Sequence, residues 1–122
     1  MQRVTLPVVL HNPKILLIGG GPVALQKAQV MRRNKIDFDV IAALCSEAMR
    51  TLVPEVCERP VTEEDCREYG IIIDATGNPG VTAMLTALKQ RLRFLLNVVD
   101  VPEQCDFFFA ALIEQGPVIR PK

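Results

Sequence analysis

The chain has 122 residues, of which 49% are hydrophobic and 23% are charged, and its formal net charge is zero. This composition is that of one globular domain with a core, and the balanced charge argues against nucleic acid or an anionic membrane as a partner. The apolar run at the amino terminus is too short for a signal peptide, and no run of about 18 apolar residues is present to span a membrane. We therefore expect a cytoplasmic protein.

The four cysteines and the single histidine are poorly arranged for a metal site. Cys45, Cys57, Cys66 and Cys105 form no CxxC pair and have no histidine at zinc spacing. A disulfide framework is not expected in a domain of this size. The sequence therefore predicts reduced thiols and no bound metal, and His11 alone makes a Ser-His-Asp relay hard to assemble.

Predicted strands and helices alternate along the first hundred residues. In chain order we expect a strand at 14–18, a helix at 23–34, a strand at 37–43, a short helix capped by Ser46, a weak strand at 55–59, a short helix opened by Thr62 and Asp65, a strand at 71–75, a helix from Asn78 to about residue 91, and a strand at 94–99. This alternation predicts an α/β, Rossmann-like, doubly wound parallel sheet in the order 3-2-1-4-5, with right-handed crossovers.

The pattern changes after Asp100. Val101 and Pro102 interrupt the fifth strand's apolar run, residues 105–113 are predicted to form another strand, and a turn at 114–117 leads into a returning strand. The phenylalanines at 107–109 favour a core or subunit interface over an aromatic ligand platform. We therefore expect a nucleotide-binding domain at residues 1–104 and the start of an antiparallel hairpin at 105–122, whose edge requires a partner chain or a longer protein.

A triple glycine follows the first predicted strand and opens the first helix. Glycine permits a tight turn and lets backbone N–H groups approach a pyrophosphate, and the helix directs the positive end of its dipole at the same charge. Gly19, Gly21 and Ala24 fit the dinucleotide fingerprint with its permitted alanine in third place. The turn, with Gly20 at its centre, predicts nucleotide binding, and a purely structural glycine turn is the alternative.

Ligands of open α/β sheets bind outside the carboxyl ends of the strands. Those ends are predicted at residues 19–23, 43–46, 74–78 and 97–100. Asp74 and Asp100 are the titratable groups there; Asp74 is expected against the flank of its strand, and Thr76 is better placed to contact a cofactor. Asp100 is expected at the rim after a buried strand, where partial desolvation would suit its carboxylate to act as a proton acceptor. The alternative is a turn carboxylate that stabilises Val101 and Pro102.

Several motifs together resemble the N-terminal domain of siroheme synthase, the family of NAD-dependent precorrin-2 dehydrogenases, some of which are also sirohydrochlorin ferrochelatases. These motifs are Leu6-Pro7, Gly19-Gly-Gly-Pro-Val-Ala24 with Lys27, Asp74-Ala-Thr76, Asn97-Val-Val-Asp100 with Pro102, and Cys105-Asp-Phe-Phe-Phe. The resemblance covers nearly the whole chain. It implies oxidation of precorrin-2 to sirohydrochlorin with hydride transfer to NAD, ferrous iron as a substrate in members that chelate, and a homodimer.

The resemblance also assigns roles to residues. It implies that Pro22 and Val23, after the glycines, and Ala43 and Leu44, after the second strand, hold the cofactor, and that Asp100 is catalytic. A carboxylate near the substrate is a suitable acceptor for the protons lost as the macrocycle becomes more conjugated, and a chelatase needs a similar group for pyrrole protons.

The sequence departs from the family pattern at two places. Family members continue past the glycine–proline turn into a dimerising segment and a helical region that helps to hold the tetrapyrrole, whereas this chain ends at Lys122. In addition, the second strand ends in Ala42 and Ala43, without an acidic residue for the ribose 2′-OH, because Asp37 and Asp39 come too early. The residues alone do not separate NAD from NADP, and the family implies NAD.

Two other functions compete with the enzyme. One is a regulatory domain that senses a dinucleotide without catalysis, and the other is a structural Rossmann-like interaction module with an empty crevice. The Asn97-Val-Val-Asp100 motif argues against the sensor, and the module requires the glycines to serve packing alone. Continuation of the reading frame past Lys122 into a helical segment would favour the enzyme.

Overall fold

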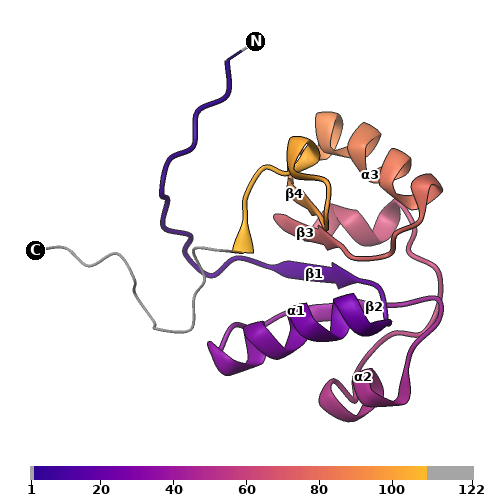
Figure 1. Ribbon diagram of the computed structural model, residues 1–122. Coiled ribbons are helices and arrows are strands. Elements are labelled where there is room, and N and C mark those ends of the chain that lie inside the picture. Colours follow the sequence, from indigo (N-terminus) through magenta and orange to yellow (C-terminus); the bar gives the residue numbers. More distant parts are fainter. Residues whose placement is uncertain (1, 110–122) are drawn as a thin grey trace, which may run out of the picture.

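The computed structural model describes residues 2–109, which fold into a parallel sheet between two layers of helices (Figure 1). The strands within these residues are β1 (Ile15–Ile18), β2 (Asp39–Ile41), β3 (Ile71–Asp74) and β4 (Leu95–Val98). They lie in the order β2-β1-β3-β4, and all neighbours are parallel. The helices are α1 (Pro22–Arg33), α2 (Glu47–Leu52) and α3 (Pro79–Leu92), with short 3-10 turns η1 (Glu64–Glu68) and η2 (Pro102–Gln104).

The central strands are apolar except for Asp74 at the carboxyl end of β3, because both of their faces are covered. Every residue of β1 and β3 is buried, as expected for a parallel sheet with helices on each side. Leu17 and Ile73 are register partners and face the α1 side, whereas Leu16 and Ile72 face the α3 side. The predicted adjacency of these two strands, and with it the doubly wound fold, is confirmed.

The weak strand predicted at 55–59 contracts to a single parallel bridge between Cys57 and Ile41. The Cys57 amide donates to the carbonyl of Val40, and the Cys57 carbonyl accepts from Ala42, both at 2.9 Å. Neighbouring side chains in this stretch are mostly exposed, so little apolar burial supports a longer ladder. The predicted order therefore holds, with its outermost strand reduced to one bridge.

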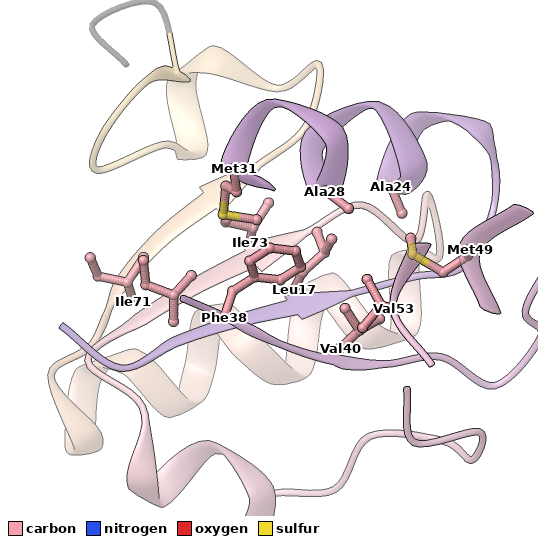
Figure 2. Close-up of a cluster of buried hydrophobic side chains, with 11 residues drawn as sticks. Leu17, Ala24, Ala28, Met31, Phe38, Val40, Met49, Val53, Ile71 and Ile73 are labelled. Atoms are coloured by element: carbon pink, nitrogen blue, oxygen red, sulfur yellow. The ribbon is translucent and has the colours of Figure 1, made fainter. Parts of the chain in front are cut away.

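One side of the core is built by α1 and α2 (Figure 2). Ala24 and Ala28 are fully buried against the sheet, and their small side chains let α1 approach closely. Met31, Met49 and Phe38 fill the remaining space, and truncation of such buried side chains to alanine typically costs about 2–5 kcal/mol. The amino end of α2 is fixed by Ser46, whose Oγ accepts from the Met49 amide at 3.1 Å, as predicted for a cap.

The other side of the core lies under α3. Leu85 and Leu88 are buried there together with Cys66 from η1 and Phe94, which precedes β4. Asn78 caps the helix, because its Oδ1 accepts from the amides of Gly80 at 2.8 Å and Val81 at 3.3 Å. The predicted cap and apolar face of this helix are both confirmed.

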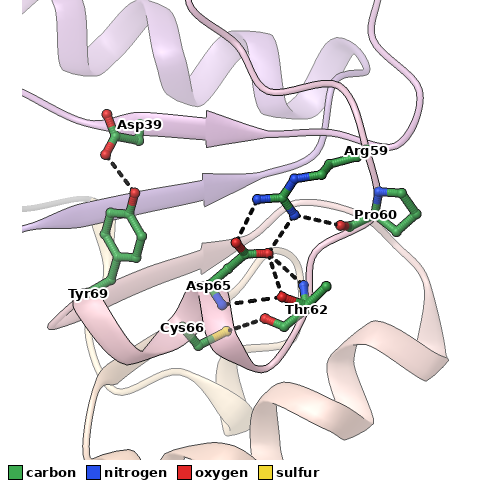
Figure 3. A network of polar contacts seen from close by, with 7 residues as sticks. All are labelled: Asp39, Arg59, Pro60, Thr62, Asp65, Cys66 and Tyr69. Carbon is green, nitrogen blue, oxygen red and sulfur yellow. Dashed lines mark hydrogen bonds and ion pairs between the residues drawn. The ribbon is translucent and has the colours of Figure 1, made fainter.

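The loop between β2 and β3 is organised by Asp65 (Figure 3). Both oxygens of this carboxylate accept from the Arg59 guanidinium at 2.7 Å. Thr62 donates its amide to Asp65, and the Asp65 amide donates back to the Thr62 hydroxyl, which is the reciprocal cap predicted from the sequence. These contacts, above all the hydrogen bond from Arg59, hold the pKa of Asp65 well below its usual range.

The strand predicted at residues 105–113 is wrong for its described part, because residues 105–109 form no strand. One backbone bond and two side-chain bonds satisfy the outer edge of β4 in place of a ladder. The Asp106 amide donates to the Leu96 carbonyl at 2.7 Å, and the Asp106 carboxylate accepts from the Leu96 amide at 2.9 Å. The Asn97 side chain donates to the Phe107 carbonyl at 2.8 Å. The Phe107 and Phe109 rings pack against the core on the α1 side. The rest of the predicted hairpin lies outside the described residues.

Candidate functional site

The first glycine of the turn is required by the backbone and by its neighbours. Gly19 has φ +131°, a conformation that L side chains rarely adopt, and its amide donates to the Ile41 carbonyl at 3.0 Å. A Cβ at Gly19 would lie 2.7 Å from the Ala75 carbonyl oxygen and 3.3 Å from the Ala24 Cβ. Gly19 therefore joins the ends of β2 and β3 to the turn and lets α1 pack close to the sheet.

The second glycine is required by the loop between β2 and α2. A Cβ at Gly20 would overlap the Leu44 carbonyl oxygen and would lie 2.7 Å from the Cys45 Cα. The Gly20 carbonyl also accepts from the Ser46 amide at 3.0 Å. Gly20 thus sets the position of this loop relative to the glycine turn.

The third glycine differs from the other two, because a Cβ at Gly21 would meet nothing within 4 Å. Gly21 is the N-cap of α1, where no side chain caps the helix, and Pro22 follows at the first helical position. The amides of Val23 and Ala24 lie in the first turn and have no intrahelical acceptor. Free amides, a positive helix end and open space meet here, which is the arrangement that binds a phosphate-like anion.

The loop after β2 brings two further predicted residues next to the turn. Ala43 is exposed, and the Leu44 side chain is 87% exposed although it is apolar. Gly20 packs directly against this loop, so the two residues stand beside the glycines. The adjacent Cys45 is no activated nucleophile, because partial burial and the nearby Glu58 carboxylate raise the pKa of its thiol.

At the carboxyl end of β3, Asp74 is buried with 1% exposure. Its carboxylate accepts from the Thr76 amide at 3.0 Å, from the Thr76 hydroxyl at 2.7 Å and from the Thr82 hydroxyl at 2.5 Å. The Thr76 hydroxyl, predicted to contact a cofactor, is thus already bound to Asp74 and also accepts from the Asn78 amide at 3.0 Å. Sequence reasoning missed Thr82, although a buried strand that ends in a carboxylate signals a need for nearby donors.

Asp100 lies in the turn after β4 and is exposed, with φ +69°. The partial desolvation expected from the sequence is not found, because the preceding strand is buried but the turn itself faces outward. Val101 donates its amide to the Val98 carbonyl at 3.0 Å and closes this turn. Within residues 2–109 the Asp100 carboxylate has no hydrogen-bond or ion-pair partner, so it faces outward with its oxygens unoccupied.

A groove of about 830 Å³ runs between α3 and the carboxyl end of β4. Asp74 and Val98 line it from the sheet, and Val99 and Val101, the neighbours of Asp100, line it at the rim. The loop at residues 75–78 separates this groove from the glycine turn, because its Gly77 lines the groove while the Ala75 carbonyl faces Gly19. The glycine turn, this loop and Asp100 therefore share the carboxyl edge of the sheet.

Two absences among the described residues concern metal ions and membranes. No group of three or more His, Cys, Asp or Glu side chains within residues 2–109 could hold a metal ion. No helix in the same part of the chain has the length and apolar character needed to cross a membrane.

The chain is similar in sequence to siroheme synthases. It is 30% identical over 114 residues to the siroheme synthase of Psychrobacter cryohalolentis, which corresponds to 90% of this chain and 22% of that protein. It is 30% identical over 121 residues to that of Ectopseudomonas mendocina, with 98% and 26% covered, and 31% identical over 114 residues to that of Pseudomonas fluorescens, with 90% and 25% covered. The chain thus spans about a quarter of the length of these relatives.

A solved structure and a family model agree with this kinship. The structure of SirC, a precorrin-2 dehydrogenase, matches with a TM-score of 0.63 and 22% identity over 79% of this chain and 50% of that one, a likeness that shows the fold. The NAD_binding_7 model, described as NAD(P)-binding, matches residues 6–111. The predicted resemblance is confirmed: the chain belongs to the NAD(P)-binding family that NAD_binding_7 describes, and its homologues are siroheme synthases.

Proposed function

We propose that this chain is the NAD-binding dehydrogenase part of an enzyme that oxidises precorrin-2 to sirohydrochlorin on the way to siroheme. The observation that carries the proposal is the division within the glycine turn: Gly19 and Gly20 are needed for packing, whereas Gly21 leaves open space at an uncapped helix start. A turn made for packing alone would not need a glycine at position 21. Kinship with siroheme synthases supports the choice of reaction.

The residues around the turn fit a dinucleotide. Gly21 and the first free amides of α1, at Val23 and Ala24, would hold the diphosphate, and Pro22 has no amide to offer. Since β2 and β3 flank β1, the adenosine half would lie toward Ala43 and Leu44 and the nicotinamide half toward the loop after β3. No acidic side chain stands at the carboxyl end of β2, at residues 42–44, to hold a ribose hydroxyl, so the choice of NAD over NADP rests on the family resemblance.

Asp100 is the residue that we propose for proton transfer. Oxidation of precorrin-2 removes a hydride, which bound NAD accepts, together with a proton. The Asp100 carboxylate, exposed at the carboxyl end of β4 and without a partner among residues 2–109, would take that proton. If the protein also inserts ferrous iron into sirohydrochlorin, the same carboxylate would accept a pyrrole proton as the metal enters.

The proposal includes the setting of the enzyme. We place the protein in the cytoplasm, in keeping with its four free cysteines, which a reducing compartment preserves. We also propose a homodimer, with residues 1–104 as the nucleotide-binding domain and residues 105–122 as the start of the segment that joins the subunits. The exposed Phe108, beside the packed rings of Phe107 and Phe109, supports an apolar contact there.

Three assays on the full-length protein test this function. Calorimetry should detect NAD binding, and NADH absorbance should rise when precorrin-2 is added with NAD. A parallel assay with sirohydrochlorin and ferrous iron tests chelation. Binding of NAD without any oxidation of precorrin-2 would identify a dinucleotide sensor instead, and failure to bind NAD or NADP would overturn the proposal.

A further inference from the structure

The buried carboxylate of Asp74 is a feature that the proposed reaction does not use. The residue is 1% exposed, and its hydrogen-bond partners are neutral: one backbone amide and two threonine hydroxyls. A carboxylate taken out of water is costly unless hydrogen bonds replace its hydration. Three donors, together with the nearby positive end of α3, supply this compensation.

The two oxygens of Asp74 connect different elements. Oδ1 accepts both bonds from Thr76, at 3.0 and 2.7 Å, and so holds the loop at residues 75–78. Oδ2 accepts the bond from Thr82 at 2.5 Å and so holds the first turns of α3. The Thr76 hydroxyl in turn accepts from the Asn78 amide at 3.0 Å, so the chain of bonds ends at the N-cap of the helix.

The loop at residues 75–78 borders the glycine turn on the β3 side of β1. The Ala75 amide donates to the Ile18 carbonyl at 2.9 Å, and the Ala75 carbonyl stands against Gly19. β3 flanks β1 on the side opposite to β2. A dinucleotide with its diphosphate at Gly21 and its adenosine over the end of β2 must extend its nicotinamide half across the end of β3, where Asp74 fixes the backbone.

We propose that Asp74 is a positioning residue that holds the loop at residues 75–78 for the nicotinamide half of the dinucleotide. The inference rests on the proposed function and adds that the two halves of the dinucleotide depend on different parts of the site. Asp74 acts through Thr76 and the loop backbone, and its hydrogen-bonding pattern, rather than its negative charge, does the positioning. The adenosine half is independent of Asp74.

The test compares NAD with ADP, which carries the adenosine and diphosphate but lacks the nicotinamide and its ribose. In the full 122-residue chain, Asp74→Ala should weaken NAD binding on the order of tenfold, the scale of one net hydrogen bond. ADP binding should stay within about twofold, because the ligand does not reach the loop. A residue with only a structural role would change both affinities together or change thermal stability alone.

Two matched variants sharpen the comparison. Asp74→Asn should restore NAD affinity, because its oxygen still accepts from Thr76 while its amide group donates to the Thr82 hydroxyl. Thr82→Val keeps the shape of the side chain and the loop bonds of Asp74, so it should lower thermal stability but leave the ratio of NAD to ADP affinity unchanged. If Asp74→Ala does not fold, Thr76→Val against Thr76→Ser carries the test, because serine restores both hydroxyl bonds and valine restores neither.

The outcomes separate this inference from the function on which it rests. A wild-type chain that binds neither NAD nor ADP overturns the proposed function and the inference with it. A wild-type chain that binds both, with an unchanged affinity ratio in Asp74→Ala and in Thr76→Val, overturns the inference and leaves the function standing. Failure of Asp74→Asn to restore NAD affinity would show that the charge acts, which also contradicts the inference.

Discussion

The three residues of the glycine turn have different roles: two of them are needed for packing, and the third leaves space open to solvent. Gly19 and Gly20 have no room for a Cβ, because the Ala75 carbonyl and the loop at Leu44 occupy that space. Gly21 has room and an ordinary backbone conformation, with φ −93° and ψ −166°. Replacement of each of the three adjacent glycines is therefore expected to have a different effect on stability and on ligand binding.

Gly20→Ala should destabilise the fold. The added methyl overlaps the Leu44 carbonyl and the Cys45 Cα, so the loop after β2 must shift, and overpacking of this kind typically costs about 1–3 kcal/mol. Urea denaturation measures the loss. Gly21→Ala is the matched control: its methyl group meets no protein atom, so it should cost no more than about 1 kcal/mol, the effect of alanine being a poorer N-cap than glycine. Equal stability of the Gly20 variant and the wild type would contradict the packing described for this turn.

Asp100 is predicted to carry chemistry but little stability. Asp100→Ala in the full-length protein should slow precorrin-2 oxidation by about 10²–10⁴-fold, the usual contribution of a general acid or base. Thermal stability and NAD affinity should barely change, because the side chain is exposed at the rim. If Asp100→Asn turned over precorrin-2 at a nearly normal rate, the carboxylate would only orient the substrate and the base would lie elsewhere.

At the level of elements, the loop between β2 and β3 depends on one ionic cap. Arg59 and Thr62 converge on Asp65, and the Tyr69 hydroxyl at the end of η1 donates to Asp39 of β2 at 2.6 Å (Figure 3). Burial and the bond to Asp39 raise the pKa of Tyr69, so the tyrosine stays protonated as a donor. The two contacts attach η1 to its flanking loop and to the sheet.

The stability that Asp65 provides should depend on pH. Its pKa is lowered in the folded state, mainly by the hydrogen bond from Arg59, from an ordinary value of 3.8. A lowered folded-state pKa gives stability that is present above about pH 4 and is lost as the pH falls below it. Asp65→Asn should therefore cost about 1–2 kcal/mol at pH 7, and the difference from the wild type should shrink at pH 3. A difference that stayed constant between these pH values in urea denaturation would contradict the role of the charge.

For the whole molecule, the sequence was sufficient to predict those elements whose local pattern agrees with the global fold. The apolar runs of β1 and β3, the caps at Ser46 and Asn78, and the glycine turn all carry local signals, and the structure confirms these elements. The weak outer strand forms only the single Cys57 bridge, because most of its side chains are exposed and too little apolar burial supports a longer ladder. Whether the candidate residues at the edge of the sheet bind a dinucleotide stays a prediction.

Other features depended on contacts between distant segments. Asp106 and Asn97 take over hydrogen bonds at the edge of β4 that the predicted strand at 105–113 would have made, and no local pattern signals this exchange. The bond between Asp74 and Thr82 likewise joins a strand end to a helix, so it required the tertiary structure. Asp100 was expected to be partly buried because a buried strand precedes it, but one turn carries it to the surface.

Calorimetric titration of NAD into the wild type and Gly21→Val tests the central claim most directly. A Cβ at position 21 meets no protein atom within 4 Å, so the variant should fold, with a loss of stability of about 1 kcal/mol because valine is a poorer N-cap for α1 than glycine. Its NAD affinity should fall by about tenfold or more, because the added methyl groups occupy the place proposed for the diphosphate. An unchanged NAD affinity in a folded Gly21→Val variant would contradict the account of this site.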